Sequence, residues 1–387
     1  MNQKTEFALK ALGTLNFRAL CREYGISAKT GYKWKERFLE KGLGGMAEES
    51  RRPLSHPEKL SEEIVCALVK LKSRHPAWGA RKIQELYRRG HPQVPLPSES
   101  SIKRVLERSG MVTKRKSRVV SKAAVRLSSG RRAQSSNEVW TADFKGWWYD
   151  LDSRRCEPLT VRDEYSRYVL EIRRLEDSRT QTVWESFERL FERYGVPQAI
   201  RSDNGSPFAS ASGVLGLSKL SSRWIALGID LERSRPSCPQ DNGAHERLHR
   251  DLSDEVQHGA QGSTQDELDL WREEYNCQRP HEALGMRMPF EVYERSARRY
   301  GGLPGALDYG SMATRVISSI GNLKWQGAQI FISSALSGWN VGLQPRHDGE
   351  LDVYFERLLL GQLDPSTFSF KRGASAPFEA DKGQENL

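Results

Sequence analysis

Cysteine is scarce in this chain of 387 residues, and the few cysteines lie far apart. The five are Cys21, Cys66, Cys156, Cys238 and Cys277, and no two of them form a Cys-x-x-Cys pair. This spacing argues against a zinc ribbon and against a disulfide framework. We therefore expect reduced and mostly buried thiols in a cytosolic protein.

Long apolar runs are also missing. No stretch approaches the ~18 apolar residues of a membrane-spanning helix, and the start, MNQKTEFALK, lacks the apolar core of a signal peptide. These absences favour a soluble, cytoplasmic protein without a membrane partner. The length leaves room for two to four domains with apolar cores.

Acidic residues are few in the first third of the chain. Residues 1–136 hold 30 of the 60 Lys and Arg but only 12 of the 50 Asp and Glu, a net charge of +18. The remainder, with 30 basic and 38 acidic residues, has a net charge of −8. This asymmetry predicts a nucleic-acid-binding front part joined to a domain with a different role.

Residues 1–50 have the pattern of a helix-turn-helix DNA-binding unit. Gly25 allows a turn, Ser27 can cap the following helix, and AKTGYKWKERFLEKG continues with helical spacing. A purely structural helical hairpin is the alternative. In the DNA-binding interpretation the second helix offers three side chains to a major groove, Lys29, Thr30 and Lys33.

Residues 60–111 predict a second helix-turn-helix unit, in which Ser98 caps a helix with Ile102 and Leu106 facing inward. Its candidate DNA contacts are Ser101, Lys103 and Arg104. Residues 112–136 then hold eight Lys and Arg and no acid, which indicates a basic linker. Such a run is either solvated or tracks DNA phosphates, and we expect contacts from Lys114, Arg115, Lys116 and Arg118.

Residues 137–300 predict a mixed α/β domain. VWTADFKGWWYD, EPLTVRDEYS and RYVLEIRRL are rich in aromatic and β-branched residues, and we expect three adjacent strands. Residues 310–365 alternate polar and apolar side chains between Gly-containing turns, which predicts a small all-β barrel of the SH3-like kind. We expect residues 366–387 to form a disordered tail.

Three acids of the α/β domain stand where carboxylates are unusual. Asp143 lies within a strand of bulky residues, Asp203 ends a short strand, and Glu246 lies off the apolar seam of its helix. A divalent cation is the most effective compensation for such carboxylates. Mg²⁺ needs only a few carboxylate oxygens besides water and phosphate, and two such ions can activate the attacking oxygen and stabilise the leaving oxygen of a phosphodiester.

Four segments in order carry a family resemblance. WTADFKGWW, IRSDNGSPF, PQDNGAHERLHRDL and YNCQRPHEALGMRMPFEVY resemble the catalytic core of bacterial insertion-sequence transposases of the retroviral-integrase type. The similarity covers roughly residues 139–293 and implies an RNase H-like fold with a D, D, E triad. Matched motif by motif, the triad is Asp143, Asp203 and Glu246, both as catalytic residues and as ligands of Mg²⁺, for which Mn²⁺ can substitute.

The resemblance implies a transposase that cuts the ends of a mobile element and joins the freed 3′-hydroxyls to target DNA. Its partners would be double-stranded DNA, as terminal inverted repeats and target, and further copies of itself in a multimeric synaptic complex. His249 and Arg250, on the face of Glu246, could hold DNA phosphates. A DNA-binding regulator descended from such an enzyme and a plain RNase H-like nuclease are the alternatives.

The spacing of the second and third acids departs from the family pattern. Asp203 and Glu246 are 43 positions apart, and ASASGVLGLSKLSSRW, residues 209–224, has the character of extra length. An insertion is tolerated if it forms a surface loop. From YNCQRPHEAL we expect Asn276, Arg279 and His281 mainly to position the loop that follows the last core helix.

Overall fold

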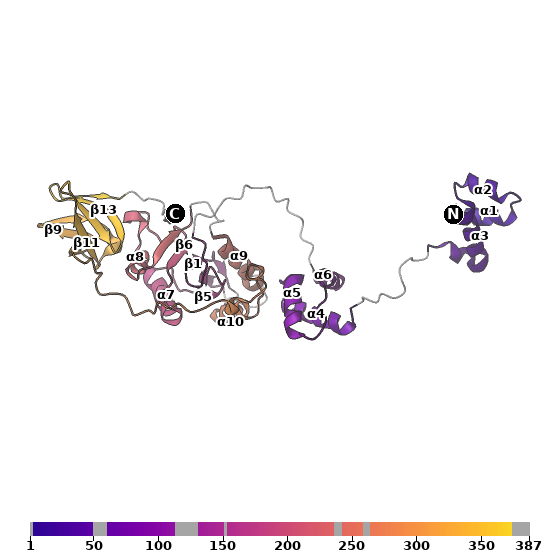
Figure 1. Cartoon of the computed structure of the whole chain (residues 1–387), viewed down its shortest axis with the longest axis horizontal. Coiled ribbons are helices and arrows are strands. Elements are labelled where there is room, and N and C mark those ends of the chain that lie inside the picture. The colour runs from indigo at the N-terminus through magenta and orange to yellow at the C-terminus, as the bar shows by residue number, and fades with distance from the viewer. Residues whose placement is uncertain are drawn as a thin grey trace, which may run out of the picture. The chain divides into compact units, whose positions relative to one another are not determined.

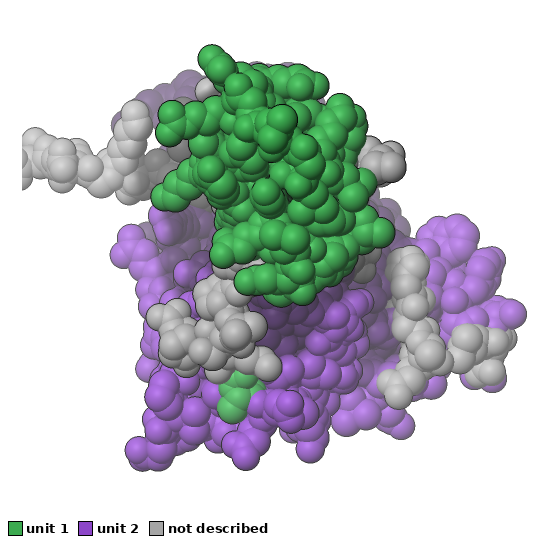
Figure 2. All heavy atoms as spheres, turned by 90° about the vertical axis from the view of Figure 1, so that its right-hand side faces the viewer, with its two compact units in different colours: residues 1–61 green, residues 62–387 purple. Residues whose placement is uncertain are grey.

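The computed structural model describes residues 3–48, 60–112, 131–150, 153–235, 242–257 and 264–373. It consists of two compact units, Met1–Ser61 and Glu62–Leu387, which Figure 2 colours separately. Each unit is described by itself. The predicted linker contacts Lys114, Arg115, Lys116 and Arg118 and the predicted tail beyond residue 373 lie outside the described residues.

The first unit contains α1 (Gln3–Gly13), α2 (Phe17–Glu23), α3 (Ala28–Lys41) and the short η1 (Gly42–Met46). The predicted turn and cap are confirmed: Gly25 has a φ of 62°, and the backbone N–H of Thr30 donates to Ser27 Oγ at 3.2 Å. Phe7 is fully buried at the centre of the unit. The predicted helix-turn-helix therefore has its own apolar core.

The second unit begins with three helices, α4 (Glu62–Arg74), α5 (Ala80–Gly90) and α6 (Glu99–Arg108). Ser98 caps α6 as predicted, accepting from the N–H of Ser101 at 3.2 Å. Ile102 and Leu106 are buried, as are Ile83 and Tyr87 of α5, and the two helices contact each other. Local sequence signals therefore place this helical block correctly.

A five-stranded mixed sheet follows (Figure 1). Its strands are β1 (Val139–Phe144), β4 (Pro158–Asp163), β5 (Val169–Arg174), β6 (Ala199–Ser202) and β7 (Asp230–Arg233), in the order β5-β4-β1-β6-β7. The first three are antiparallel neighbours, which confirms the prediction of three adjacent strands, and β6 and β7 run parallel to β1. A small hairpin of β2 (Trp148–Tyr149) and β3 (Arg155–Cys156) was not predicted.

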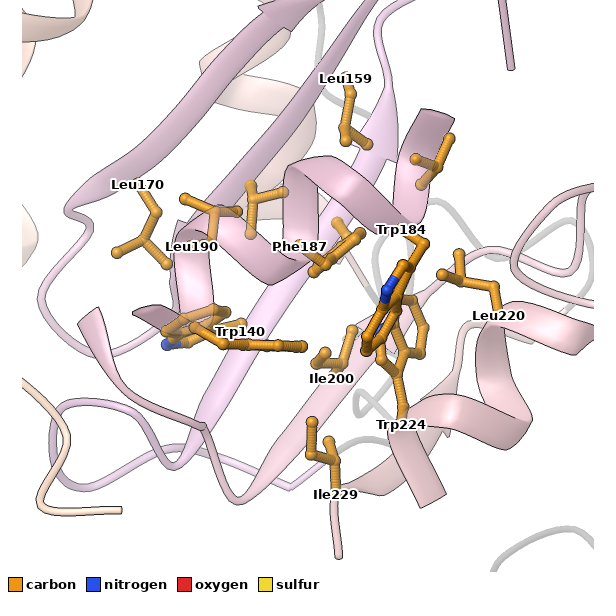
Figure 3. Close-up of a cluster of buried hydrophobic side chains, with 14 of the residues drawn as sticks. Trp140, Leu159, Leu170, Trp184, Phe187, Leu190, Ile200, Leu220, Trp224 and Ile229 are labelled. Atoms are coloured by element: carbon orange, nitrogen blue, oxygen red, sulfur yellow. The ribbon is translucent and has the colours of Figure 1, made fainter. Parts of the chain in front are cut away.

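Two apolar clusters flank this sheet. Helices α7 (Thr180–Tyr194) and α8 (Lys219–Ala226) pack on it around Trp140, Phe187 and Trp224 (Figure 3). Helices α9 (Gly243–Leu252) and α10 (Gln265–Cys277), joined through η4 (Ser253–Gln257), form a separate cluster with Val169 and Ile172 of β5. The sheet is thus covered by helices, and α9 brings Glu246 into this domain.

The C-terminal part is all-β, as predicted, but a closed barrel is not confirmed. Strands β8 (Ala313–Val316), β11 (Asn340–Pro345), β12 (Leu351–Phe355), β13 (Leu358–Asp364) and β14 (Ser369–Arg372) form an open antiparallel sheet in the order β14-β13-β12-β11-β8. Strands β9 (Asn322–Trp325) and β10 (Ala328–Phe331) form a separate hairpin. Alternating hydropathy predicts strands but does not specify whether the first and last strands pair.

Residues 209–224 do not form a surface loop. They include η2 (Val214–Gly216) and most of α8, and Val214 and Leu217 are almost completely buried. Both belong to the apolar cluster that contains Val341 and Leu343 of β11. The Ser222 hydroxyl also donates to the Ala335 carbonyl at 2.9 Å. The extra length therefore attaches the C-terminal sheet to the central domain.

The described cysteines are reduced, but only half of them are buried. Cys21 and Cys156 are buried, whereas Cys66 and Cys277 are exposed. In the part of the chain that the structure describes, we find no helix that combines the length and the apolar character needed to cross a membrane.

Candidate active site

Strand register aligns two of the predicted site residues. Strand β1 pairs in parallel with β6, with Thr141 opposite Arg201. Counting two residues onward on each strand aligns Asp143, on β1, with Asp203, directly after β6. Successive side chains of a strand point to opposite faces, so residues two positions apart lie on the same face. The carboxylates of Asp143 and Asp203 are therefore expected on one face of the sheet, the face of Thr141 and Arg201.

Asp203 lies in a tight turn that needs a glycine. The N–H of Gly205 donates to Asp203 Oδ1 at 3.1 Å. A Cβ at position 205 would approach Asp203 Oδ2 to 2.9 Å, closer than a carbon normally comes to a carboxylate oxygen. Gly205 therefore lets the backbone hold the Asp203 carboxylate in place.

Helix α9 brings Glu246 to the same region. Leu248 and Leu252 are fully buried, whereas Glu246 and Arg250 are exposed. This confirms the predicted division of the helix into an apolar seam and a polar face. His249 belongs to the same helix, and its Nδ1 lies 3.9 Å from Oδ2 of Asp143 on β1.

Electrostatics couples the three acids. The pKa of Asp143 is raised to about 7, first by burial, then by the charge of Asp203 and, to a smaller degree, by that of Glu246. The negative charges of Asp203 and Glu246 thus act on Asp143, and nearby positive charges do not fully balance them. The structure therefore places Asp203, in a turn, and Glu246, on a helix, near enough for their charges to act on Asp143 of β1.

A hydrogen-bond network lies behind Asp143. The Thr160 hydroxyl donates to the Asp143 carbonyl at 2.9 Å and contacts the Nε2 atoms of His245, at 2.6 Å, and of His249, at 2.8 Å. Because its single proton goes to the carbonyl, both Nε2 atoms must be protonated and donate to Thr160. Position 160 thus assigns the tautomer of both histidines.

The network continues to a buried arginine. Arg162 Nε donates to Thr141 Oγ1 at 3.3 Å, and the Thr141 hydroxyl lies 2.8 Å from His245 Nδ1. Since Nε2 of His245 carries the proton, Thr141 donates to Nδ1. Arg162 Nη1 also donates to the Ala244 carbonyl at 2.9 Å, which ties the start of α9 to β4.

His249 differs from its predicted role as a phosphate contact. Burial is the main cause that lowers its pKa to about 3, and the positive charges of Lys145 and Arg162 lower it further. The ring is therefore neutral at neutral pH, so its approach to Asp143 is not an ion pair and Nδ1 presents a lone pair to that carboxylate. With only 14% of its side chain exposed, His249 is better placed to act within the carboxylate site than on its surface.

The predicted DNA contacts in the front part lie on helix surfaces. Lys29 and Lys33 are exposed on α3, and Lys103 and Arg104 are exposed on α6. The hydroxyls of Thr30 and Ser101 instead contact the capping hydroxyls of their own helices, each at 2.9 Å. The four basic side chains therefore remain the candidate DNA contacts of these two helices, and the two hydroxyl residues have local structural roles.

Two residues of YNCQRPHEAL make structural contacts, but only Arg279 lies in the loop that we expected them to position, whereas Asn276 lies in α10 itself. The Asn276 side chain accepts from the N–H of Val169 at 2.8 Å and donates to the Val169 carbonyl at 2.9 Å. Arg279 pairs with Asp251 at 3.1 Å and with Glu255 at 2.9 Å. The Asn276 contacts fix α10 to β5, and the Arg279 contacts fix the residues directly after α10 to α9 and η4.

Sequence reasoning missed Thr160, His245 and Lys145. Thr160 is a neighbour of Asp143 because the β1–β4 register places the two residues opposite each other. The sequence does not reveal this register. His245 could have been found, because it lies four residues before His249 and hence on the same side of a helix. Lys145, partly buried, is near enough for its charge to lower the pKa of Asp143 and of His249.

The donor set suits a hard divalent cation without forming a complete cage. Among the described residues, no three carboxylate, imidazole or thiol groups converge as a ready-made metal centre. Three coupled carboxylates, one with a raised pKa, are nevertheless the donors that Mg²⁺ prefers, and Mg²⁺ retains several waters when protein-bound. The residues present therefore fit such an ion.

Family models match several parts of the chain. A helix-turn-helix domain model matches residues 3–53, and a homeodomain-like domain model matches residues 30–106. Integrase core domain models match residues 133–239 and 227–289. The first of these two matches includes Asp143 and Asp203, and the second includes Glu246.

Curated relatives come from bacterial mobile elements. The chain is 26% identical over 254 residues to an uncharacterized 39.2 kDa protein of insertion element IS476 from Xanthomonas euvesicatoria, covering 64% of this chain and 69% of that protein. It is 25% identical over 246 residues to an uncharacterized 31.7 kDa protein of insertion element IS407 from Burkholderia multivorans, covering 61% and 82%. The transposase for transposon Tn552 of Staphylococcus aureus is 24% identical, with 62% and 53% covered.

Solved integrase structures are also similar. The catalytic core domain of BIV integrase matches with 25% identity and a TM-score of 0.32, covering 41% of this chain and 93% of that one. The HTLV-2 integrase catalytic core domain in complex with magnesium matches with 14% identity and a TM-score of 0.31, covering 42% and 100%.

Proposed function

Because the chain belongs to the bacterial insertion-sequence transposases with a retroviral-integrase-type core, we propose that it cuts DNA at the ends of its mobile element and joins the freed 3′ ends to target DNA. Family membership supports DNA cleavage and integration in general. The observation that carries the proposal of a metal-dependent mechanism is the parallel register of β1 and β6, which aligns Asp143 with Asp203. The raised pKa of Asp143, caused first by burial and then by the charges of Asp203 and Glu246, is consistent with it.

In this proposal Asp143, Asp203 and Glu246 hold a divalent cation, Mg²⁺ or in its place Mn²⁺. When bound, such an ion supplies Lewis-acid activation of the phosphodiester and of the attacking oxygen. The chain's own residues keep the carboxylates in place: Gly205 binds the Asp203 carboxylate, and Thr160 binds the backbone of Asp143. No covalent protein intermediate is required.

The neutral His249 has a separate proposed role in the site. Its Nε2–H donates to Thr160, so its Nδ1 remains an acceptor beside Asp143. From this position it can accept a hydrogen bond from a water molecule or a DNA 3′-hydroxyl that approaches the carboxylates. Lys145 supplies a positive charge nearby for a DNA phosphate.

We further propose that the exposed basic residues of α3 and α6 bind the terminal inverted repeats. The chain would act in a multimeric synaptic complex that holds two element ends and the target DNA. Exposed Arg250, on the polar face of α9, is a candidate phosphate contact beside the carboxylates.

Asp143→Asn, Asp203→Asn and Glu246→Gln should each abolish cleavage and joining while DNA binding remains close to wild type. The reason is that each change removes a charge needed for the chemical step, whereas the positive side chains lie elsewhere. Cleavage, strand transfer and gel shift on the same preparations test this. Substantial strand transfer by one variant would remove that residue from the triad.

The same experiment separates the alternatives. A DNA-binding regulator would bind the element's ends without cutting them in any form, including wild type. A plain RNase H-like nuclease would cut without joining the 3′ end to a second duplex. Only a transposase yields strand-transfer product that depends on all three acids.

A further inference from the structure

A basic hollow lies in the second unit, apart from the carboxylates. It has a volume of about 560 Å³, and its lining includes Arg132, Glu164, Tyr165, Arg167, Leu284 and Arg287. The N–H of Glu164 donates to the Val139 carbonyl at 2.9 Å, which places the hollow at the start of β1. Asp143 is four residues further along β1, roughly 13 Å away at 3.3 Å per residue.

Arg167 is presented to the hollow by a rigid turn. Its φ of 64° is in the left-handed region, which a non-glycine residue occupies only when the surrounding structure holds it there. The buried Asp163 does so, because its Oδ2 accepts from both the N–H and the hydroxyl of Ser166, at 2.8 and 2.6 Å. The hydrogen bonds of Asp163 thus hold the turn, and the turn fixes the backbone from which the Arg167 side chain extends.

Arg287 and Arg132 are also attached to ordered backbone. The Arg287 carbonyl accepts from the N–H of His281 at 3.0 Å, which closes the turn that carries it. Arg132 follows Arg131, whose guanidinium pairs with Asp230 at 2.9 Å and whose carbonyl accepts from Arg201 Nη2 at 2.5 Å. Although Arg131 lies within the predicted basic linker, residues 112–136, these contacts make it a structural part of the central domain.

The charge of the three lining arginines is only partly balanced within the described residues: Glu291, which pairs with Arg89, lies near enough to Arg287 for their charges to interact. No carboxylate there pairs with Arg132, Arg167 or Arg287, and the Arg287 Nε donates only to the Leu284 carbonyl, at 3.4 Å. The acid in the lining, Glu164, gives its Oε1 to Arg201 at 2.9 Å. This excess of positive charge is notable, because residues 137–387 together carry a net charge of −8.

We propose that this hollow binds the phosphate backbone of double-stranded DNA, as a second DNA contact of the catalytic domain away from the carboxylates. The proposal rests on the proposed function, since that function brings DNA to this domain. Guanidinium groups match phosphate oxygens in geometry and charge. Arg132 directly continues the basic linker sequence, so DNA that follows the linker reaches the hollow next. Tyr165, 37% exposed, can pack against a deoxyribose.

The test is the salt dependence of DNA affinity for the full chain with Arg167→Gln and Arg287→Gln combined. Each phosphate contact contributes about −0.9 to the slope of log affinity against log salt on duplex DNA, so losing both should flatten the slope by about 1.8. A random-sequence duplex is the probe, since phosphate contacts carry no base information. The matched control combines Arg295→Gln and Arg299→Gln, two exposed arginines outside the hollow, which should leave the slope near wild type.

Lysine variants distinguish loss of charge from loss of fold. Arg167→Lys with Arg287→Lys should retain most of the slope, and thermal melting should show the Gln variant folded. A wild-type slope in the folded Gln variant overturns the proposal. If the Gln variant keeps the wild-type slope but loses self-association in light scattering, the proposal is also overturned. The hollow would then bind an acidic surface of a second copy of the chain.

Failure of this proposal and failure of the proposed function are distinguishable. Asp143→Asn should lose cleavage and keep the full salt slope. A flattened slope in the Gln variant would support the hollow even if wild type showed no strand transfer. Strand transfer in wild type with no change of slope in the Gln variant would leave the proposed function standing and remove the hollow.

Discussion

At the scale of single residues, Asp143 should make stability depend on pH. Its pKa rises from 3.8 to about 7 on folding, so the folded protein retains a proton that the unfolded chain releases. The resulting stabilisation is complete below about pH 4 and is lost as the pH rises through about 7. Urea unfolding in EDTA should therefore show wild type losing stability relative to Asp143→Asn over this range. Parallel pH profiles would contradict the raised pKa.

Thr160 should matter through its hydroxyl. In Thr160→Val, the Nε2–H groups of His245 and His249 lose their acceptor, and a buried unsatisfied donor costs about 1–3 kcal/mol. We expect a lower free energy of unfolding by at least this amount, together with slower cleavage, because His249 is no longer oriented. Thr160→Ser keeps the hydroxyl and should restore cleavage. Equal cleavage by the Ser and Val variants would show that the network does not position His249.

At the scale of elements, the segment from η2 through α8 should determine how firmly the C-terminal sheet is attached. Leu217→Ala removes an almost fully buried side chain from the cluster shared with that sheet and should lower the free energy of unfolding by about 2–5 kcal/mol. Lys219→Ala, at an exposed neighbouring position, is the control and should stay within about 0.5 kcal/mol. Chemical denaturation measures both. Equal effects would mean that the burial of Leu217 does not attach the C-terminal sheet.

At the scale of the whole molecule, residues 1–61 should be removable as a unit. They form a compact unit with its own core. In contrast, α4 and α5 are tied to the central domain by a hydrogen bond between His75 and Glu274 at 2.8 Å and by an ion pair between Arg89 and Glu291 at 2.6 Å. A chain starting at residue 62 should keep its melting temperature and lose specific footprinting of the element's ends. A chain starting at residue 137 lacks these pairs and Arg131, so it should melt at a lower temperature. Circular dichroism and footprinting test both, and an unchanged footprint without residues 1–61 would place recognition elsewhere.

Local signals explain why the elements themselves could be predicted. Ser27 and Ser98 cap their helices as expected, because a capping contact joins residues only three positions apart. Charge distribution and residue chemistry likewise indicate a DNA-binding front part and a carboxylate site. The burial of Leu217 depends on contacts with residues more than 100 positions away, and the openness of the C-terminal sheet depends on which of its strands pair. Periodicity reports neither.

The sequence by itself indicated most of the helices and strands and, together with the family resemblance, the three candidate acids, since each depends on residue type and near neighbours. It did not indicate α8 or the β2–β3 hairpin. Tertiary structure alone decided which side chains meet. The β1–β4 register puts Thr160 opposite Asp143, and Thr160 then sets the tautomer of His249. Folding likewise holds Arg131 in ion pairs, while its neighbour Arg132 lines the basic hollow. The physical reason is that strand register and side-chain packing are properties of distant segments acting together.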